Sequence, residues 1–212
     1  MDLLYPPKCM LCHRVMESSD HPVCPTCGCD LPEYDGAPRK VPYFEKVVTP
    51  FYYEDHIRDA VRRFKFHGMQ SYAGQFARWM AVLIRAELEG KYDLISWVPC
   101  SAKRRWARGF DQAELLAKHL SKELGVPCVP VLKKVRNTPK QSQMPNAARR
   151  RGNVLGAYKA WNPEAFSGKR ILLVDDILTT GATLSECGKV LRIAGSGDPV
   201  CAVIATARRN TE

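Results

Sequence analysis

The chain has 212 residues, 45% hydrophobic and 25% charged, with a formal net charge of +10. This composition is typical of a globular protein with one ordinary core and a small appendage. Apolar runs stay well short of the roughly 18 residues of a membrane span, and the start, MDLLYPPKCMLC, lacks the apolar segment of a signal peptide. We therefore expect no membrane insertion and a cytoplasmic protein.

Two cysteine pairs open the chain. Cys9 and Cys12 form one C-x2-C pair, and Cys24 and Cys27 form another, with eleven residues between the pairs. In a reducing compartment, pairs with this spacing predict two knuckles that close a tetrahedral structural Zn²⁺ site. The alternative is four reduced cysteines in a small core. Cys29 follows Cys27 too closely for a further knuckle, and its role stays open.

Four turn residues, Pro32, Gly36, Pro38 and Pro42, then predict a linker. We place a zinc-ribbon-like domain at residues 1–36 and a larger domain at 37–212. In the latter, 47–53 reads as a strand, 55–66 as a helix and 70–89 as a longer amphipathic helix. Lys65 is either a ligand-binding residue or one of several cations at the carboxyl end of its helix.

Residues 93–98, DLISWV, predict a buried strand, and a small polar loop follows it: Cys100, Ser101, Ala102 and Lys103. A loop of this type with a lysine can hold a diphosphate, although many strand-to-helix loops look similar. Cys100 has no histidine close in sequence, so we expect a buried thiol rather than a nucleophile. A helix ending near Gly125 and a short strand at 129–132 are expected next.

Basic residues are concentrated between residues 100 and 151. This segment holds thirteen lysines and arginines but only three acids, which accounts for the whole net charge. Such clustering favours a polyanion partner about as strongly as a solvated surface. The candidate contacts are Arg104, Arg105, Arg108, Arg136, Arg149, Arg150 and Arg151. Trp106 and Phe110 are the few aromatic platforms here, so contacts should be mainly to phosphates.

The sequence ILLVDDILTTGAT, residues 171–183, is the most informative stretch. Its apolar start predicts a parallel strand buried on both faces, which places Asp175 and Asp176 at a ligand-binding edge of the sheet. Thr183 and Glu186 have capping-box spacing, so a helix is expected to begin at Thr183. The loop would then offer backbone N–H groups to a phosphate, and the acids would accept hydrogen bonds from vicinal hydroxyls. The loop residues are Thr179, Thr180, Gly181, Ala182 and Thr183.

Two other site types fit this stretch poorly. A Walker A loop requires a lysine that is absent here. A receiver domain would need a further domain downstream, and only 36 residues follow Asp176. The remaining alternative is a strand end whose acids cap a turn. The stretch resembles the phosphoribosyl diphosphate (PRPP) signature of type I phosphoribosyltransferases, and the loop 100–103 resembles their pyrophosphate loop.

Several motifs in order resemble the ComF/GntX group of bacterial phosphoribosyltransferase-like proteins. These are the cysteine pairs, Arg-Gly-Phe-Asp-Gln at 108–112, Arg-x-Thr-x-x-Gln at 136–141, Arg-x-Asn-Val-x-Gly-Ala-Tyr at 151–158 and the PRPP loop. The resemblance implies an α/β fold: a type I phosphoribosyltransferase-like core with a mostly parallel sheet, plus the zinc-binding segment. Asp111 replaces an asparagine found in many members; either can hydrogen-bond a loop backbone.

The resemblance also implies a role in natural competence. The expected protein binds PRPP with Mg²⁺ and assists uptake of single-stranded DNA in transformation, with a competence helicase as partner. The alternative is an active phosphoribosyltransferase acting on an unidentified base or small acceptor. In that case Asp175 and Asp176 would steady the ribose as charge develops, and Lys103 would take the leaving pyrophosphate. No nucleobase hood can be read from the sequence.

Overall fold

A mostly parallel sheet lies at the centre of the computed structural model, which describes residues 6–136 and 154–208. Its strands run in the order β1, β7, β6, β3, with β2 also paired to β7, and every pairing among them is parallel. The bounds are β1 Val47–Val48, β2 Phe51–Tyr52, β3 Leu94–Trp97, β6 Ile171–Leu178 and β7 Val200–Thr206. Because the strands are parallel, their carboxyl ends share one edge, where ligands bind in such sheets.

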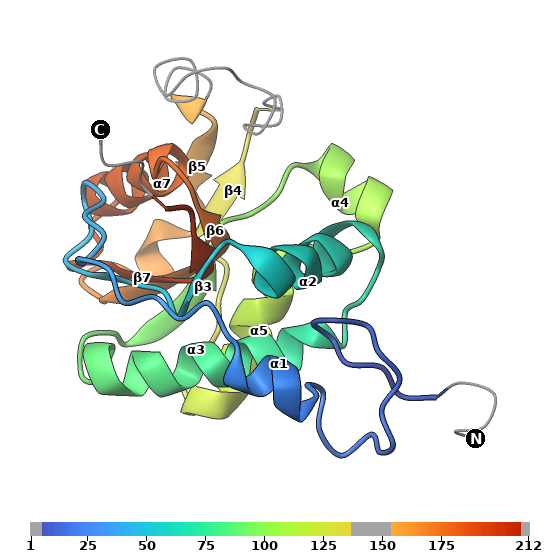
Figure 1. The fold of residues 1–212 in the computed structure, drawn as a ribbon. Coiled ribbons are helices and arrows are strands. Elements are labelled where there is room, and N and C mark those ends of the chain that lie inside the picture. Colours follow the sequence, from blue (N-terminus) through green and yellow to red (C-terminus); the bar gives the residue numbers. More distant parts are fainter. Residues whose placement is uncertain (1–5, 137–153, 209–212) are drawn as a thin grey trace.

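Helices cover both faces of the sheet (Figure 1). On one side, α3 (Tyr72–Leu88) packs against α5 (Gln112–Leu124), with α2 (Asp55–Phe66) beside them; α7 (Ala182–Ile193) lies on the other side. Strand β6 contributes to both layers. Leu172 and Val174 join the core under α3 and α5, whereas Ile171 and Leu173 join the core under α7. This alternation confirms a strand buried on both faces.

Several shorter elements complete the fold. Helix α4 (Ala102–Arg108) follows β3 and buries none of its residues. Strands β4 (Leu132–Lys134) and β5 (Tyr158–Ala160) form a separate antiparallel ribbon, and a 3₁₀ turn, η2 (Pro163–Ala165), leads into β6. Among the described residues, none of the helices is both long and apolar enough to cross a bilayer.

The cysteine-rich segment packs directly on the larger domain. Its one helix is α1 (Pro25–Cys29). Met10 and Leu11, each 1% exposed, belong to the same core cluster as Phe64 of α2. Arg63 of α2 donates hydrogen bonds to the carbonyl oxygens of both residues. The chain after α1 is tied to β2 by bonds from Tyr34 N to Pro50 O and from Tyr52 N to Pro32 O.

Several predicted boundaries differ from the structure. The strand expected at 47–53 is split by Thr49-Pro50, since proline has no N–H for the sheet. The strand expected at 129–132 occurs at β4, three residues later, although a bridge joins Ile95 to Cys128. Helix α4 was not predicted, because a helix that buries nothing has no apolar period.

Candidate functional site

A cavity of about 310 Å³ opens at the carboxyl ends of β3 and β6. Residues from helices, strands and loops that are far apart in the sequence line it, so no single motif describes it. They are Tyr53, Lys65, Phe66, Val98, Pro99, Cys100, Arg104, Arg108, Asp111, Gln112, Ala113, Lys134, Val154, Tyr158, Asp175, Asp176, Ile177, Thr179 and Thr183. The sequence-based site residues Asp175, Asp176, Thr179, Thr183, Cys100, Arg104 and Arg108 are among them.

The paired aspartates lie within β6, which continues to Leu178 rather than ending at Val174. Asp175 accepts a hydrogen bond from the Asp176 N–H at 2.8 Å. Burial, with the adjacent Asp176 charge second, raises the pKa of Asp175 to about 8. Asp176 forms a 2.8 Å ion pair with Lys65 of α2, both side chains being 16% exposed. One of the two acids thus already has a cation partner.

The helix after β6 begins one residue earlier than predicted. Helix α7 starts at Ala182, and its N-cap is Gly181 with φ of 78°, a conformation that favours glycine. The predicted capping box is wrong: Glu186 instead accepts a hydrogen bond from Gly156 N at 2.6 Å. The Ala182 N–H donates to Thr180 Oγ1 at 3.4 Å. Thr179 and Thr183 line the cavity.

The loop after β3 is held by a buried carboxylate. Asp111, 5% exposed, accepts a hydrogen bond from Cys100 N at 2.7 Å and caps α5 through Ala113 N and Glu114 N. Ser101 caps α4, Ala102 is its first residue, and Lys103 is exposed and does not line the cavity. Cys100 is only partly buried and lines the cavity, so the expected burial of this thiol is not found. Desolvation raises its pKa to about 12, which keeps the thiol protonated and argues against a nucleophile.

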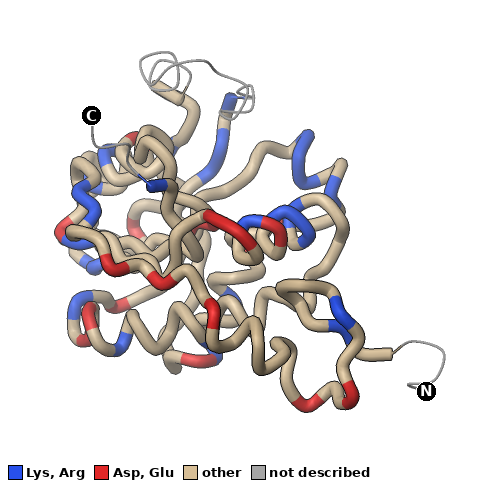
Figure 2. The backbone as a smooth tube through the Cα atoms, viewed as in Figure 1, with Lys and Arg blue, Asp and Glu red and all other residues tan. Residues whose placement is uncertain are grey.

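Basic residues occur on α4, α2 and β4 (Figure 2), and Lys65, Arg104, Arg108 and Lys134 among them line the cavity. Arg104 and Arg108 lie four residues apart on α4 and so face the same way. Arg105 pairs with Glu114 at 3.2 Å, and Arg136 donates to the Leu155 carbonyl at 2.6 Å, both outside the cavity lining. Arg149, Arg150 and Arg151 lie outside the described residues.

The lining residues that were not predicted from the sequence include four with polar side chains: Tyr53, Gln112, Lys134 and Tyr158. The Lys134 Nζ donates to the Tyr158 hydroxyl at 3.0 Å, and burial lowers the pKa of Lys134. The two residues face each other across the β4–β5 ribbon. The contact between Lys134 and Tyr158 depends on the register of β4 and β5, which the sequence does not give. Gln112 and Tyr158 could have been proposed as site residues, because each belongs to one of the motifs shared with the ComF/GntX group.

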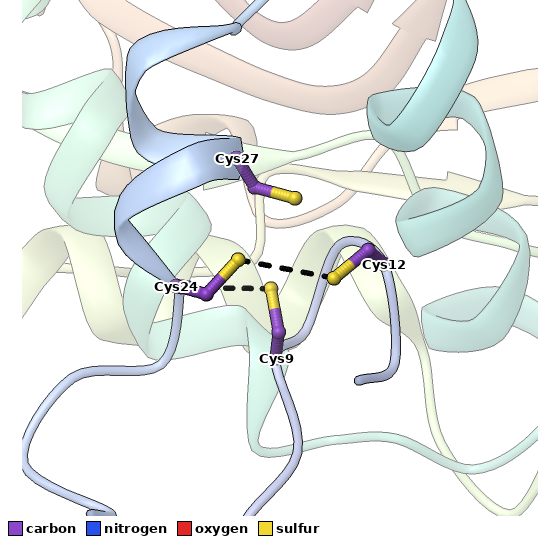
Figure 3. A group of neighbouring side chains, drawn as sticks. All are labelled: Cys9, Cys12, Cys24 and Cys27. Atoms are coloured by element: carbon purple, nitrogen blue, oxygen red, sulfur yellow. Dashed lines mark hydrogen bonds between the residues drawn. The ribbon is translucent and has the colours of Figure 1, made fainter. Parts of the chain in front are cut away.

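The four cysteines converge as expected (Figure 3). The sulfur atoms of Cys9, Cys12, Cys24 and Cys27 all lie within 4.8 Å of one another. Cys12 Sγ and Cys24 Sγ are 3.8 Å apart. Two thiolates on a tetrahedral zinc with Zn–S of about 2.3 Å would be separated by roughly 3.8 Å. The cluster could therefore hold a metal ion.

The two knuckles reach this geometry by different routes. In the second knuckle, Pro25 starts α1 and Gly28 lies inside that helix. A positive φ occurs at His13, 65°, after the first pair. A hydrogen bond from Arg14 to the Cys12 sulfur, 3.4 Å, lowers the pKa of Cys12 to about 6 and favours the thiolate that metals bind.

Comparison with known proteins identifies the family. Competence protein F of Haemophilus influenzae is 32% identical over 197 residues, covering 88% of this chain and 85% of the relative. The chain belongs to the ComF family of competence proteins. Other ComF-family relatives are DNA utilization protein YhgH of Escherichia coli, 29% identical over 86% of this chain and 83% of its own, and Competence protein ComFC of Bacillus subtilis, 26% identical over 91% and 80%.

The phosphoribosyl transferase domain family matches residues 111–212 of this ComF-family chain. An adenine phosphoribosyltransferase structure from Thermoanaerobacter pseudethanolicus aligns with 80% of this chain and 95% of its own, at 19% identity and a TM-score of 0.41. The domain match and the parallel sheet confirm the predicted class, a type I phosphoribosyltransferase-like fold with a cysteine-rich N-terminus.

Proposed function

We propose that this protein binds PRPP with Mg²⁺ in the cavity and assists uptake of single-stranded DNA during natural transformation. The observation that carries the first part is the convergence of two aspartates with a threonine loop at one sheet edge. Asp175 and Asp176 would accept hydrogen bonds from the ribose hydroxyls. The loop from Thr179 to Thr183 would hold the 5′-phosphate at the start of α7. Carboxylate oxygens are ligands that Mg²⁺ prefers, so Asp175 and Asp176 could help to hold this ion, which would supply positive charge to the diphosphate.

The metal of the cysteine cluster is proposed to be one structural Zn²⁺ per chain. Four thiolates in tetrahedral spacing are the donor set of structural zinc sites, which stabilise small segments with little core of their own. Elemental analysis of protein purified without chelator is expected to give one zinc per chain. A metal-free protein with an intact N-terminal segment would contradict this proposal.

The DNA part rests on charge, together with the similarity to Competence protein F and Competence protein ComFC. Helix α4 carries Lys103, Arg104, Arg105 and Arg108 and no acid, and Trp106 on the same helix is 90% exposed. Phe110, in contrast, packs against Phe64 in the core, with ring centroids 5.9 Å apart, and is not a platform. Phosphate contacts with one stacking residue suit single strands of any sequence. The family's role in transformation implies a competence helicase as a further partner.

Calorimetry tests the PRPP site. The double variant Asp175→Asn, Asp176→Asn should bind PRPP more weakly, because an NH₂ group that cannot accept a hydrogen bond replaces one oxygen of each carboxyl group. A control with the same charge change, Asp198→Asn with Glu164→Gln, alters two exposed acids that do not line the cavity. Equal PRPP affinity in all three proteins would place the site elsewhere.

A salt titration tests DNA binding. Four or five neutralised phosphates should give a slope of log K against log salt of roughly −3 to −3.5 on single strands. Replacing Arg149, Arg150 and Arg151 with alanine should flatten that slope. A matched control replaces the exposed Lys159, Lys169 and Lys189, which lie outside the basic segment. Identical slopes in all three proteins would argue against Arg149–Arg151, and no binding at low salt would exclude the DNA function.

One observation favours phosphoribosyl transfer as a second candidate. A carboxyl group with a pKa of about 8, such as Asp175, can take a proton from an acceptor near neutral pH. Asp175 would lie beside the ribose in the proposed pose. Measuring PRPP turnover with a panel of bases, with and without single-stranded DNA, tests this candidate. Turnover that survives Asp175→Asn unchanged would remove Asp175 as the base.

A further inference from the structure

The motif Arg108-Gly109-Phe110-Asp111-Gln112 has a defined structural task at four of its five positions. Arg108 stacks on the Phe66 ring at 4.9 Å. Gly109 ends α4 with φ of 80°, and Phe110 packs in the core. Asp111 caps α5 and holds the loop after β3. These contacts fix the fifth residue, Gln112, in the wall of the cavity.

Gln112 has an unsatisfied donor. Its residue is only 2% exposed, and its Oε1 accepts a hydrogen bond from Arg108 Nη1. Its Nε2 is buried and has no hydrogen-bond partner among the described residues. Rotating the amide would place two donors face to face, since arginine can only donate, so the network sets the orientation. A buried donor without a partner is unfavourable unless a ligand in the cavity supplies an acceptor.

The surroundings of Gln112 indicate what that acceptor is. Arg108 and Arg104 are neighbouring lining residues on α4, and both can only donate hydrogen bonds. The nearby Cys100 N–H is already bound to Asp111, so this amide of the loop after β3 is not available to a ligand. Several side-chain donors with two positive charges match a group that carries only acceptor oxygens and negative charge.

We propose that Gln112, Arg108 and Arg104 bind the diphosphate group of the ligand through their side chains, with inorganic pyrophosphate as the smallest ligand of this subsite. The assignment rests on the proposed PRPP function and deepens it. It moves diphosphate recognition from the loop Cys100–Lys103 to the face of α4 and the start of α5. Gln112 acts as a donor that discriminates in favour of phosphoryl oxygen.

The test is calorimetric titration of the full zinc-loaded chain with pyrophosphate and Mg²⁺. Gln112→Met keeps the approximate shape but removes both the donor and the acceptor for Arg108. Gln112→Glu keeps that acceptor and replaces the donor by a second acceptor, so it tests the donor separately. Each variant should bind pyrophosphate about tenfold or more weakly, the usual effect of losing a hydrogen bond to a charged group. Gln75→Met, on α3 and outside the cavity lining, is the matched control and should bind as the wild type does.

Stability measurements separate binding from structure. Gln112→Met removes an unsatisfied donor, which favours the folded state, and the acceptor for Arg108 Nη1, which disfavours it, so its melting temperature should change little while its pyrophosphate affinity falls. Wild-type affinity for pyrophosphate in both Gln112 variants, or no binding by the wild type, overturns the inference. If PRPP binds and only the Gln112 effect is missing, the proposed function stands without this subsite. If pyrophosphate binds through Gln112 but PRPP does not bind, the proposed PRPP function is wrong, whereas the assignment of a pyrophosphate subsite stands.

A second arm distinguishes the source of the phosphate. A single-stranded oligonucleotide with a 5′-phosphate replaces pyrophosphate in the same titrations. The proposal expects the Gln112 variants to bind it as the wild type does. A Gln112 effect seen with the oligonucleotide and not with pyrophosphate overturns the proposal in favour of a DNA phosphate site.

Discussion

Replacing Asp111 with alanine is expected to destabilise the protein more than any other single change at the edge of the cavity. The carboxylate accepts three backbone hydrogen bonds: from Cys100 at 2.7 Å, from Ala113 at 3.1 Å and from Glu114 at 3.4 Å. Loss of a helix N-cap costs about 0.5–2 kcal/mol. Leaving the Cys100 N–H without its partner costs about 1–3 kcal/mol more.

The combined loss is roughly 2–4 kcal/mol, which corresponds to a fall in Tm of roughly 5–15 °C for a chain of this size. Ser101→Ala is the matched control, because Ser101 also caps a helix but accepts one bond of 3.4 Å, at the start of an exposed helix. Urea unfolding followed by circular dichroism measures both. A difference of less than about 0.5 kcal/mol between Asp111→Ala and Ser101→Ala would refute the assignment, since surface changes fall in that range.

Asp111→Asn sharpens this test. The sequence suggested that aspartate and asparagine are nearly equivalent here, because either can bind a loop backbone. The structure shows that both carboxylate oxygens are used, Oδ2 for Cys100 and Oδ1 for α5. Asparagine offers only one oxygen, so an intermediate loss of stability is expected.

Three further outcomes are expected. Cys24→Ser should release the metal yet leave the sheet domain folded, measured by elemental analysis and circular dichroism; a variant that keeps its zinc would exclude Cys24 as a ligand. Trp106→Ala should weaken binding of single-stranded DNA by about 1–3 kcal/mol, the range for one stacked base, without altering PRPP affinity; unchanged affinity would remove Trp106 from the interface. Hydrogen bonds from Arg170 lower the pKa of Asp93 to about 2. The stability from this pair is therefore present above about pH 4 and is lost as the pH falls towards 2. Its size is at most about 1 kcal/mol, because the two side chains are 39% and 44% exposed. Asp93→Asn should remove this acid-sensitive part of the unfolding free energy, and identical pH profiles would contradict it.

The sequence predicts well what depends on local chemistry. Burial of Leu172 and Leu173 on opposite faces follows from an unbroken apolar run, and convergence of the cysteine cluster follows from its spacing. The position where the strand ends does not follow from the sequence, because β6 continues past the polar residues Asp175 and Asp176 to Leu178. Only the pairing with β7, which continues to Thr206, determines that extension.

The choice of basic residues that line the cavity is a second feature that the sequence did not predict. The sequence indicated Lys103 for the diphosphate, but successive residues on a helix point about 100° apart. Once α4 forms, Arg104 and Arg108 face the cavity and Lys103 does not. The unpartnered Nε2 of Gln112 could not be predicted from the sequence, because it depends on the position of the Arg108 guanidinium, which occupies the other end of the amide.

The contact between the cysteine-rich segment and α2 has a consequence for fragments of this protein. Met10 and Leu11 cover apolar side chains of the larger domain, and their carbonyl oxygens satisfy Arg63. A fragment beginning at residue 37 would expose that apolar surface and leave the arginine without those acceptors. Exposed apolar surface of this kind promotes self-association. The segment is therefore a layer of the folded body, and a sheet domain prepared without it should aggregate even though every residue of the cavity is present.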